Sequence, residues 1–190
     1  MVALLIALGV LLGIALIIGL YIMGVYNGLV KLRQAVRNAW SQIDVQLKRR
    51  HDLIPNLVNT VKGYATHEKS TLDAVISARA KATSVNVTAG TAERMKAEGE
   101  LSSALSRLLM VTENYPALKA DKQFIMLQEE LTSTENRVAF ARQYYNDSAQ
   151  QHNVAVQTFP AVLIAGMLGF KEEPFFEAPA EAKNAPTVQF

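Results

Sequence analysis

The stretch Val2–Tyr26, VALLIALGVLLGIALIIGLYIMGVY, contains no Lys, Arg, Asp, Glu or His. At ~1.5 Å rise per residue, a helix of this length exceeds the ~30 Å hydrocarbon core of a bilayer. A secretory signal peptide is the rival interpretation, but its apolar region is usually only ~7–15 residues long and follows a basic segment. Here no basic segment precedes the run, and it reaches Tyr26 without an Ala-x-Ala-like cleavage site. We therefore predict a retained transmembrane anchor over residues 1–26.

The charges that follow the anchor predict its orientation. Lys31, Arg33 and Arg37 all precede the first acidic residue, Asp44. By the positive-inside rule, this excess of basic residues places the C-terminal domain in the cytoplasm. We therefore predict a single-pass membrane protein, and the lipid bilayer is one of its partners.

Composition excludes several classes of function. The formal net charge of +2 is too small to indicate a nucleic-acid partner or an acidic substrate. The chain has no Cys, which excludes disulfides, thiolate metal sites and cysteine nucleophiles. The residues beyond the anchor suffice for one domain of ordinary size.

Apolar residues recur at seven-residue spacing after the anchor, and Pro55 is the one proline between Tyr26 and Ala82. The stripe is broader than a two-stranded coiled-coil seam and is typical of a helix packed in a bundle. We expect one helix running from the anchor to near Ala82, kinked at Pro55. The positions of the stripe are Val36, Ala39, Trp40, Ile43, Leu47, Leu53, Ile54, Leu57, Val61 and Tyr64.

Arg50 interrupts this stripe, because it falls on the row that holds Ile43 and Leu57. Its side chain either snorkels to the surface or pairs with an acid on a neighbouring helix. The alternative is that Arg50 serves as a polar register or docking point.

Two further helices are predicted. Residues 83–91 read as a loop, with Thr91 as the N-cap of a helix that ends near Asn114-Tyr115-Pro116. A third helix is expected from about Leu118 to Thr158. Its apolar row, again at seven-residue spacing, is Phe124, Leu131, Val138, Tyr145, His152 and Phe159. With no strand pattern in the sequence, we predict an all-α fold in which residues 27–158 form an antiparallel bundle of long helices.

The last part of the chain changes in character. Phe159-Pro160 should break the helix, and residues 159–170 form a short uncharged segment that cannot span a bilayer. This segment either caps the bundle or lies on a membrane or partner surface. Residues 171–190, with Pro174 among three prolines, are predicted to be an irregular tail in which Phe175 and Phe176 dock on the bundle or on a partner.

The search for chemistry yields no candidate site. A di-iron bundle needs Glu-x-x-His motifs, and none of His51, His67 and His152 has Glu three positions before it. There is no nucleophile elbow, P-loop or dinucleotide fingerprint. We therefore predict no catalytic, cofactor-binding or metal-binding residues, no cofactor, no evident small-molecule substrate, and a protein that is not an enzyme. Each His is expected to be a surface or interhelical polar residue.

Glycines in the anchor suggest self-association. Gly9 and Gly13 are four residues apart, as are Gly24 and Gly28, and such pairs let helices approach closely in lipid. A homo-oligomer is therefore expected.

Several motifs spread over nearly the whole chain resemble the LemA family of bacterial membrane proteins. The resemblance implies an N-terminal anchor, a bundle of long helices and a bacterial inner (cytoplasmic) membrane, and it supplies no mechanism. The matching stretches are Tyr26-Asn27-Gly28-Leu29-Val30, residues 37–50, residues 52–58, Glu135-Asn136-Arg137, Ala141-Arg142, Tyr145-Asn146, Phe159-Pro160, Gly169-Phe170 and Phe175-Phe176.

The sequence thus leads to one functional hypothesis and one alternative. The hypothesis is a non-enzymatic, membrane-anchored helical protein that self-assembles and scaffolds or regulates other envelope proteins, through a protein partner that the sequence does not identify. The alternative is a sensory or signalling receptor or adaptor, in which a ligand or partner shifts the helices.

Overall fold

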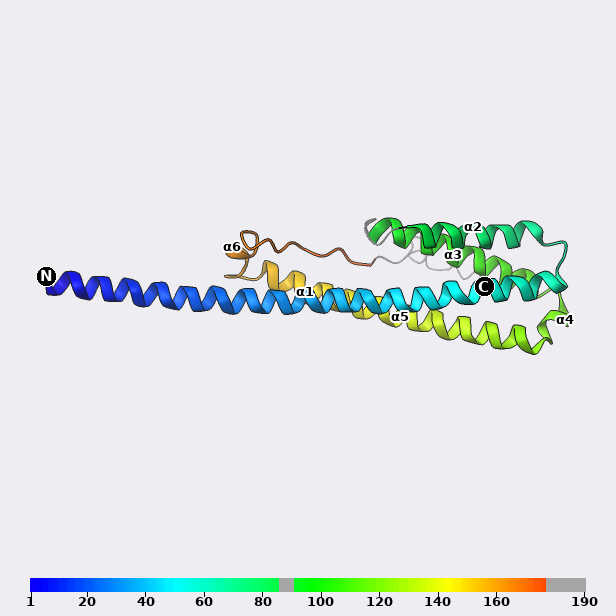
Figure 1. Ribbon diagram of the computed structural model, residues 1–190, viewed down its shortest axis with the longest axis horizontal. Coiled ribbons are helices and arrows are strands. Elements are labelled where there is room, and N and C mark those ends of the chain that lie inside the picture. Colours follow the sequence, from blue (N-terminus) through cyan, green and yellow to red (C-terminus); the bar gives the residue numbers. More distant parts are fainter. Residues whose placement is uncertain (86–90, 177–190) are drawn as a thin grey trace, which may run out of the picture. The chain divides into compact units, whose positions relative to one another are not determined.

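The computed structural model describes residues 1–85 and 91–176. The regular secondary structure of these residues consists of helices, without strands. The helices are α1 (Val2–Tyr64), α2 (Lys69–Ser84), α3 (Thr91–Thr112), α4 (Pro116–Lys119), α5 (Lys122–Gln157) and α6 (Val162–Ala165) (Figure 1). The predicted all-α fold, in which an N-terminal apolar helix continues into a helical bundle, is confirmed.

The chain divides into two compact units. The anchor unit consists of Met1–Trp40 and Tyr144–Phe175, and the bundle unit consists of Ser41–Gln143 together with Phe176. Helices α1 and α5 are each divided between the two units, α1 after Trp40 and α5 after Gln143. The 63-residue helix α1 contains the one stretch of the described chain that is long and apolar enough to cross a membrane, and none of that stretch is buried.

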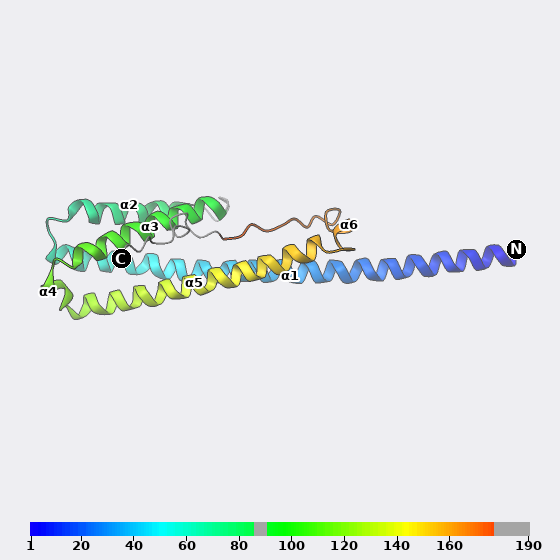
Figure 2. The ribbon, with the colours of Figure 1, turned by 180° about the vertical axis from the view of Figure 1, so that it is seen from behind.

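In the bundle unit, α2 and α3 lie beside parts of α1 and α5 (Figure 2). Their apolar side chains form one core, to which α4 adds Leu118. The seven-residue rows of α1 supply Ile54, Leu57 and Val61 to this core, and α5 supplies Phe124 and Leu131. The remaining members come mainly from α2 and α3, which form a helical hairpin. They include Leu72, Val75, Leu101, Leu105 and Leu108.

Helix α1 ends earlier than expected. It stops at Tyr64 rather than near Ala82, and residues 65–68 turn the chain into a separate helix, α2. The Ala65 side chain is fully buried at the turn, and the Tyr115 hydroxyl donates a hydrogen bond of 3.0 Å to Glu68 Oε1. The turn lets the apolar side of α2 fold back onto the core, so the bundle has four helical segments instead of three.

Two other boundaries differ from the predictions. Helix α2 continues through Thr83 and Ser84, where a loop was expected, and the rest of that loop, residues 86–90, lies outside the described residues. The third predicted helix is interrupted between α4 and α5. The Asp121 carboxylate accepts a hydrogen bond of 2.9 Å from the Phe124 amide, which caps the start of α5 and explains the new boundary.

The anchor unit packs α1 from Val25 to Trp40 against the end of α5, α6 and the extended residues that follow. The chain turns at a cis Phe159–Pro160 bond, and Gly169 has φ +76°, a left-handed conformation that favours glycine. The small core of this unit consists of Leu29, Val156, Ala165 and Phe170.

Candidate functional site

The Arg50 side chain lies fully buried inside the bundle unit, at 0% exposure. Its Nη2 donates a hydrogen bond of 2.8 Å to Ser102 Oγ. Its Nη1 lies 3.5 Å from Glu98 Oε2, and its Nε lies 2.9 Å from Glu135 Oε1. Neither ion pair has the alignment of a hydrogen bond, so charge attraction holds them together. Arg50 thus pairs with acids on neighbouring helices and does not snorkel to the surface.

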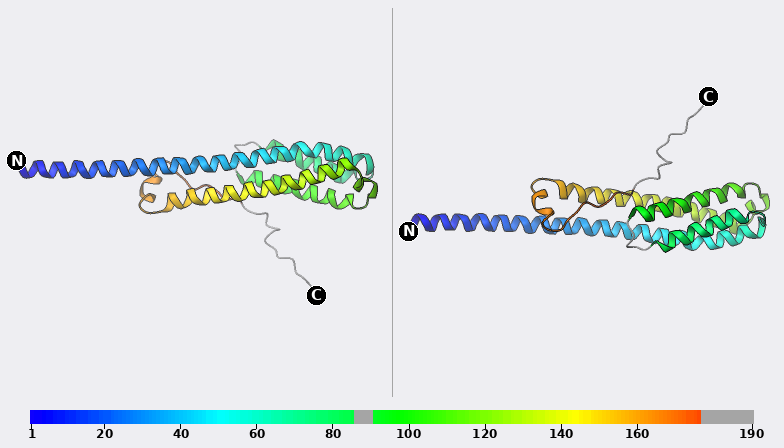
Figure 3. Two further views of the ribbon diagram at one scale, coloured as in Figure 1. Left: turned by 90° about the horizontal axis from the view of Figure 1, so that it is seen from below. Right: turned by 90° about the horizontal axis from the view of Figure 1, so that it is seen from above.

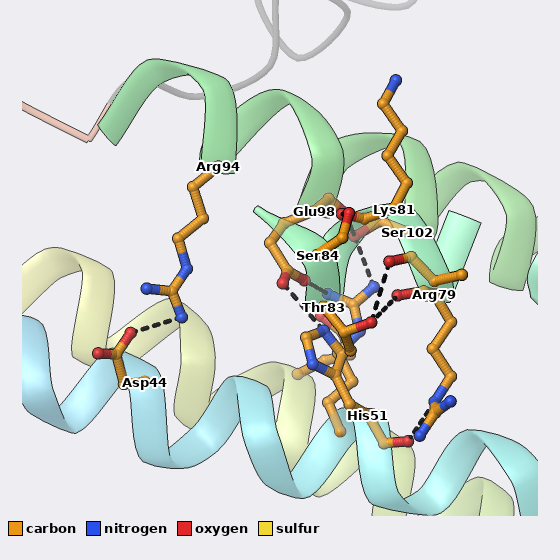
Figure 4. Close-up of polar contacts among 12 residues, drawn as sticks. Asp44, His51, Arg79, Lys81, Thr83, Ser84, Arg94, Glu98 and Ser102 are labelled. Atoms are coloured by element: carbon orange, nitrogen blue, oxygen red, sulfur yellow. Dashed lines mark hydrogen bonds and ion pairs between the residues drawn. The ribbon is translucent and has the colours of Figure 1, made fainter. Parts of the chain in front are cut away.

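Glu98 is the acidic centre of this cluster, and it too is buried. Besides Arg50, it faces His51, whose Nε2 lies 2.9 Å from Glu98 Oε1 (Figure 4). Consecutive residues of α1 thus reach one carboxylate of α3. The interhelical role expected for His51 is confirmed.

Arg142 of α5 adds a second cation to the same region. Its half-buried position lowers the pKa of the guanidinium, and the positive charge of Arg50 lowers it further, whereas Glu135 and Glu98 raise it. The Arg142 guanidinium also stacks over the Phe176 ring, 4.5 Å from its centroid. Two arginines and two glutamates therefore balance in charge. We name Arg50, His51, Glu98, Ser102, Glu135 and Arg142 the charge cluster.

Pro55 leaves the carbonyl of His51 without its usual partner in α1, because proline has no N–H to donate four residues back. Arg79 of α2 replaces that donor, and its Nε lies 2.8 Å from the His51 oxygen (Figure 4). The proline that was expected to kink the helix thus creates a docking point for a neighbouring helix. The backbone of α1 is helical on both sides of Pro55.

Arg94 of α3 forms a further interhelical contact, to Asp44 of α1, with 2.6 Å between Nη2 and Oδ1 (Figure 4). Burial raises the pKa of Asp44, and the charge and hydrogen bond of Arg94 oppose that shift. Thr91, which was expected to be the N-cap, is the first residue of α3.

Glu173 and Pro174 of the tail are fastened to α5 within the anchor unit, and residues 177–190 lie outside the described residues. Asn153 Nδ2 donates to the Glu173 carbonyl and Asn153 Oδ1 accepts from the Glu173 amide, both at 2.8 Å. The Tyr145 hydroxyl donates a hydrogen bond of 2.9 Å to the Pro174 carbonyl, and burial raises the pKa of Tyr145 to about 12. Phe176 is buried, as expected for docking, whereas Phe175 is about half exposed.

These arrangements suit packing rather than a reaction. Among the described residues, no group of three or more His, Asp or Glu side chains is placed to hold a metal ion. His67 is exposed, and His152 is buried in the anchor unit with its ring 6.4 Å from that of Phe170. The predictions that the protein has no catalytic residues and no cofactor remain predictions.

Residues 39–190 match the LemA family, and this match covers well over half of the chain. The chain belongs to the LemA family. The resemblance seen in the sequence is thereby confirmed.

Among its LemA-family relatives, the magnetosome protein MamQ of Magnetospirillum gryphiswaldense is 27% identical over 179 residues, which cover 82% of this chain and 66% of that protein. The magnetosome protein MamQ 2 of Paramagnetospirillum magneticum is 26% identical over 175 residues, covering 80% of this chain and 64% of the relative. Protein LemA of Metamycoplasma hominis is 26% identical over 152 residues, covering 80% and 68%. The chain thus spans slightly less than two thirds of the length of the MamQ relatives. With the apolar helix α1, the family places this chain among membrane-associated helical proteins.

Proposed function

We propose that this protein is a non-enzymatic scaffold that self-assembles through its membrane anchor and holds or regulates other envelope proteins. The observation that carries the proposal is the unbroken helix α1, which leads from the uncharged run directly into the bundle. The charge cluster supports it, because Arg50 and His51 of α1 form ion pairs with glutamates of α3 and α5. The MamQ relatives support it too, since they are named for the magnetosome and not for a reaction.

The glycines of the anchor provide the surface for self-assembly. At ~100° per residue, Gly9, Gly13, Gly24 and Gly28 fall within one sector of about 100° on α1. A Cβ added at any of the four would meet nothing within 4 Å, so this side of the helix is open. Small residues on an open side allow the backbones of two copies to approach closely in lipid.

Gly19 supplies a matched control. It is equally open, but it lies outside the glycine sector. We expect native mass spectrometry of the full chain from detergent to show an oligomer for the wild type and for Gly19→Leu. Gly13→Leu together with Gly24→Leu should shift the mass to the monomer. A monomeric wild type, or equal effects of the control and the double variant, would contradict self-assembly through this sector.

The proposed orientation has the bundle unit in the cytoplasm, at the inner membrane of a bacterium. It is supported by Lys31, Arg33 and Arg37, which follow the uncharged run directly. Partner proteins would then meet the bundle on the cytoplasmic side. Affinity capture from membranes carrying the full chain, compared with the monomeric double variant, tests whether assembly is needed to retain them.

A further inference from the structure

A patch of exposed apolar side chains lies on and around α6. Phe159, Leu163 and Met167 are spaced four residues apart, and they are 74%, 65% and 87% exposed. Val162 is also exposed beside them. We name these four residues the apolar patch. Large exposed apolar side chains gathered on one short segment indicate an interaction site with a membrane or a protein.

The opposite side of the same segment is packed. Ala165 and Phe170 are buried against Leu29 of α1 and Val156 of α5, and Val25 packs at the edge of this cluster. Figures 1 and 3 show α6 beside the early part of α1, within the anchor unit. The segment therefore divides into an inner side held by the protein and an outer side, the apolar patch, that no described residue covers.

Helix α1 and the chain that follows α6 both change from uncharged to charged residues, and the two changes lie at the same height along α1. On α1 the change falls between Val30 and Lys31, and in the tail it falls between Phe170 and Lys171. The Phe170 ring marks the shared level, because it lies 5.8 Å from the Tyr26 ring and 4.8 Å from the Arg33 guanidinium. Tyr26 and Arg33 lie on either side of the change on α1.

The position of this level along α1 indicates that the membrane covers the apolar patch. The run without charge from Val2 to Val30 measures roughly 43 Å as a helix, which is about the thickness of a bilayer with its headgroup regions. Val25 and Leu29, where α6 is held, therefore lie at the boundary of the hydrocarbon. The chain from Asn153 to Phe170 carries no Lys, Arg, Asp, Glu or His, so nothing charged opposes insertion.

We propose that the apolar patch inserts into the leaflet from which α1 emerges, as a second, interfacial contact with the membrane. The occupant is lipid, because the patch continues the apolar surface of the span at its end. An amphipathic segment of this kind lies with its apolar side ~5–10 Å into the headgroup and acyl boundary. Lys31 and Lys171, both exposed, lie where they would meet anionic headgroups. This contact holds the anchor unit in one orientation relative to the membrane, because it prevents rotation about the long axis of α1. It depends on the membrane span of the proposed function and not on self-association.

The absence of Cys allows single-cysteine variants without background labelling. The full chain, carrying a nitroxide spin label at Leu163→Cys or at Met167→Cys, is reconstituted into vesicles of phosphatidylcholine and phosphatidylglycerol at 3:1. Power saturation compares collisions with oxygen, which partitions into lipid, and with a water-soluble nickel chelate. Both positions are expected to favour oxygen over nickel.

Three controls separate the outcomes. Leu12→Cys tests the span itself and should favour oxygen more strongly. Met110→Cys, at an exposed apolar side chain of the bundle unit, and Glu172→Cys, just beyond the charge boundary, should favour nickel.

A nickel preference at positions 163 and 167 with an oxygen preference at position 12 would overturn the interfacial contact and leave the span intact. Low access to both reagents with spin–spin broadening would mean that a second copy covers the apolar patch, and low access without broadening would mean that the chain itself does. Either result overturns the proposal. A nickel preference at position 12 would refute the membrane span along with it.

Discussion

Arg50 shows why a charged residue can occupy a core position. Removing two charges from water costs several kcal/mol per ion, and mutual attraction offsets that cost only where further polar partners are supplied. Here Glu98, Glu135 and the Ser102 hydroxyl surround the Arg50 guanidinium. We propose that the arrangement fixes the register of α1 against α3 and α5, because a slip of either helix would leave buried charges unpaired.

Replacing Glu98 with glutamine tests this function of the charge cluster. The variant leaves Arg50 buried without its buried carboxylate, and we expect the free energy of unfolding to fall by ~3–5 kcal/mol. Urea unfolding in mild detergent, followed by circular dichroism, measures the change. Glu100→Gln is the matched control two residues along α3, where an exposed ion pair with Lys81 contributes little. Equal effects of the two variants would contradict the assignment.

The contact between Arg79 and the His51 carbonyl makes a separate prediction. Arg79→Ala leaves a part-buried carbonyl without a donor, at an expected cost of ~1–3 kcal/mol. In a Pro55→Ala background, residue 55 regains its N–H and can donate to the same carbonyl, so the cost of Arg79→Ala should shrink. A double-mutant cycle by urea unfolding measures this coupling. Additive effects of the two substitutions would show that Arg79 does not replace the missing helix donor.

At the scale of elements, Glu173 and Pro174 of the tail are held to α5 by hydrogen bonds with Asn153 and Tyr145. Asn153→Ala removes both hydrogen bonds to Glu173, at ~1 kcal/mol each. Hydrogen exchange of the amides around Glu173 should accelerate by roughly ten- to thirtyfold, since 1.4 kcal/mol corresponds to a factor of ten. Gln151→Ala, at an exposed position on the same helix, should leave exchange unchanged. Unaltered exchange in Asn153→Ala would mean that other contacts hold the tail.

Tyr145 gives the same segment a pH dependence. Its folded pKa, about 12, is raised above the ordinary value of 10.0, chiefly by burial and also by the charge of Glu173. The stability that it contributes is therefore complete below pH ~10 and is lost as the pH rises toward ~12. Hydrogen bonds to carboxylates also raise the pKa values of Tyr64 and Tyr115. Ultraviolet difference titration should therefore show a late phase of tyrosine ionisation, and Tyr145→Phe should remove its last step. Early ionisation of all the tyrosines would contradict the burial of Tyr145.

Periodicity along the chain predicted the helices better than their ends. The rows of α1 and α5 correctly named buried residues such as Ile43, Leu57 and Val138, because a seven-residue spacing places side chains on one side of a helix. The turn after Tyr64 was missed because residues 65–68 contain neither proline nor glycine. Its cause is tertiary, since Ala65 is buried and Glu68 is bound by Tyr115.

The charge cluster was only half visible in the sequence. Arg50 stood out because it broke an apolar row, and an acidic partner on another helix was one of the interpretations that this position left open. Glu98 gave no such signal, because α3 has a weaker periodic pattern and acidic residues are common on helix surfaces. The contact of Arg79 with a backbone carbonyl leaves no pattern at all, although Pro55 indicated that a carbonyl would lack its donor.

On the scale of the whole molecule, the membrane determines which surfaces meet which partners. If the basic residues after the span lie in the cytoplasm, Met110 of α3 lies there too. A membrane-impermeant maleimide should therefore fail to label Met110→Cys in intact spheroplasts and should label it after lysis. Labelling of intact spheroplasts would place the bundle unit outside the cytoplasm and reverse the proposed topology.

The central claim is that copies of this chain assemble through the glycine sector of the anchor. A scan of single cysteines from Leu8 to Gly28, oxidised in native membranes, tests it most directly, because the natural chain has no cysteine to interfere. We predict cross-linked dimers that peak on the side of the glycine sector, at positions 13, 17, 20 and 24, and reach a minimum on the opposite side, at positions 15 and 22. Uniform cross-linking along the helix, or none at any position, would contradict the account.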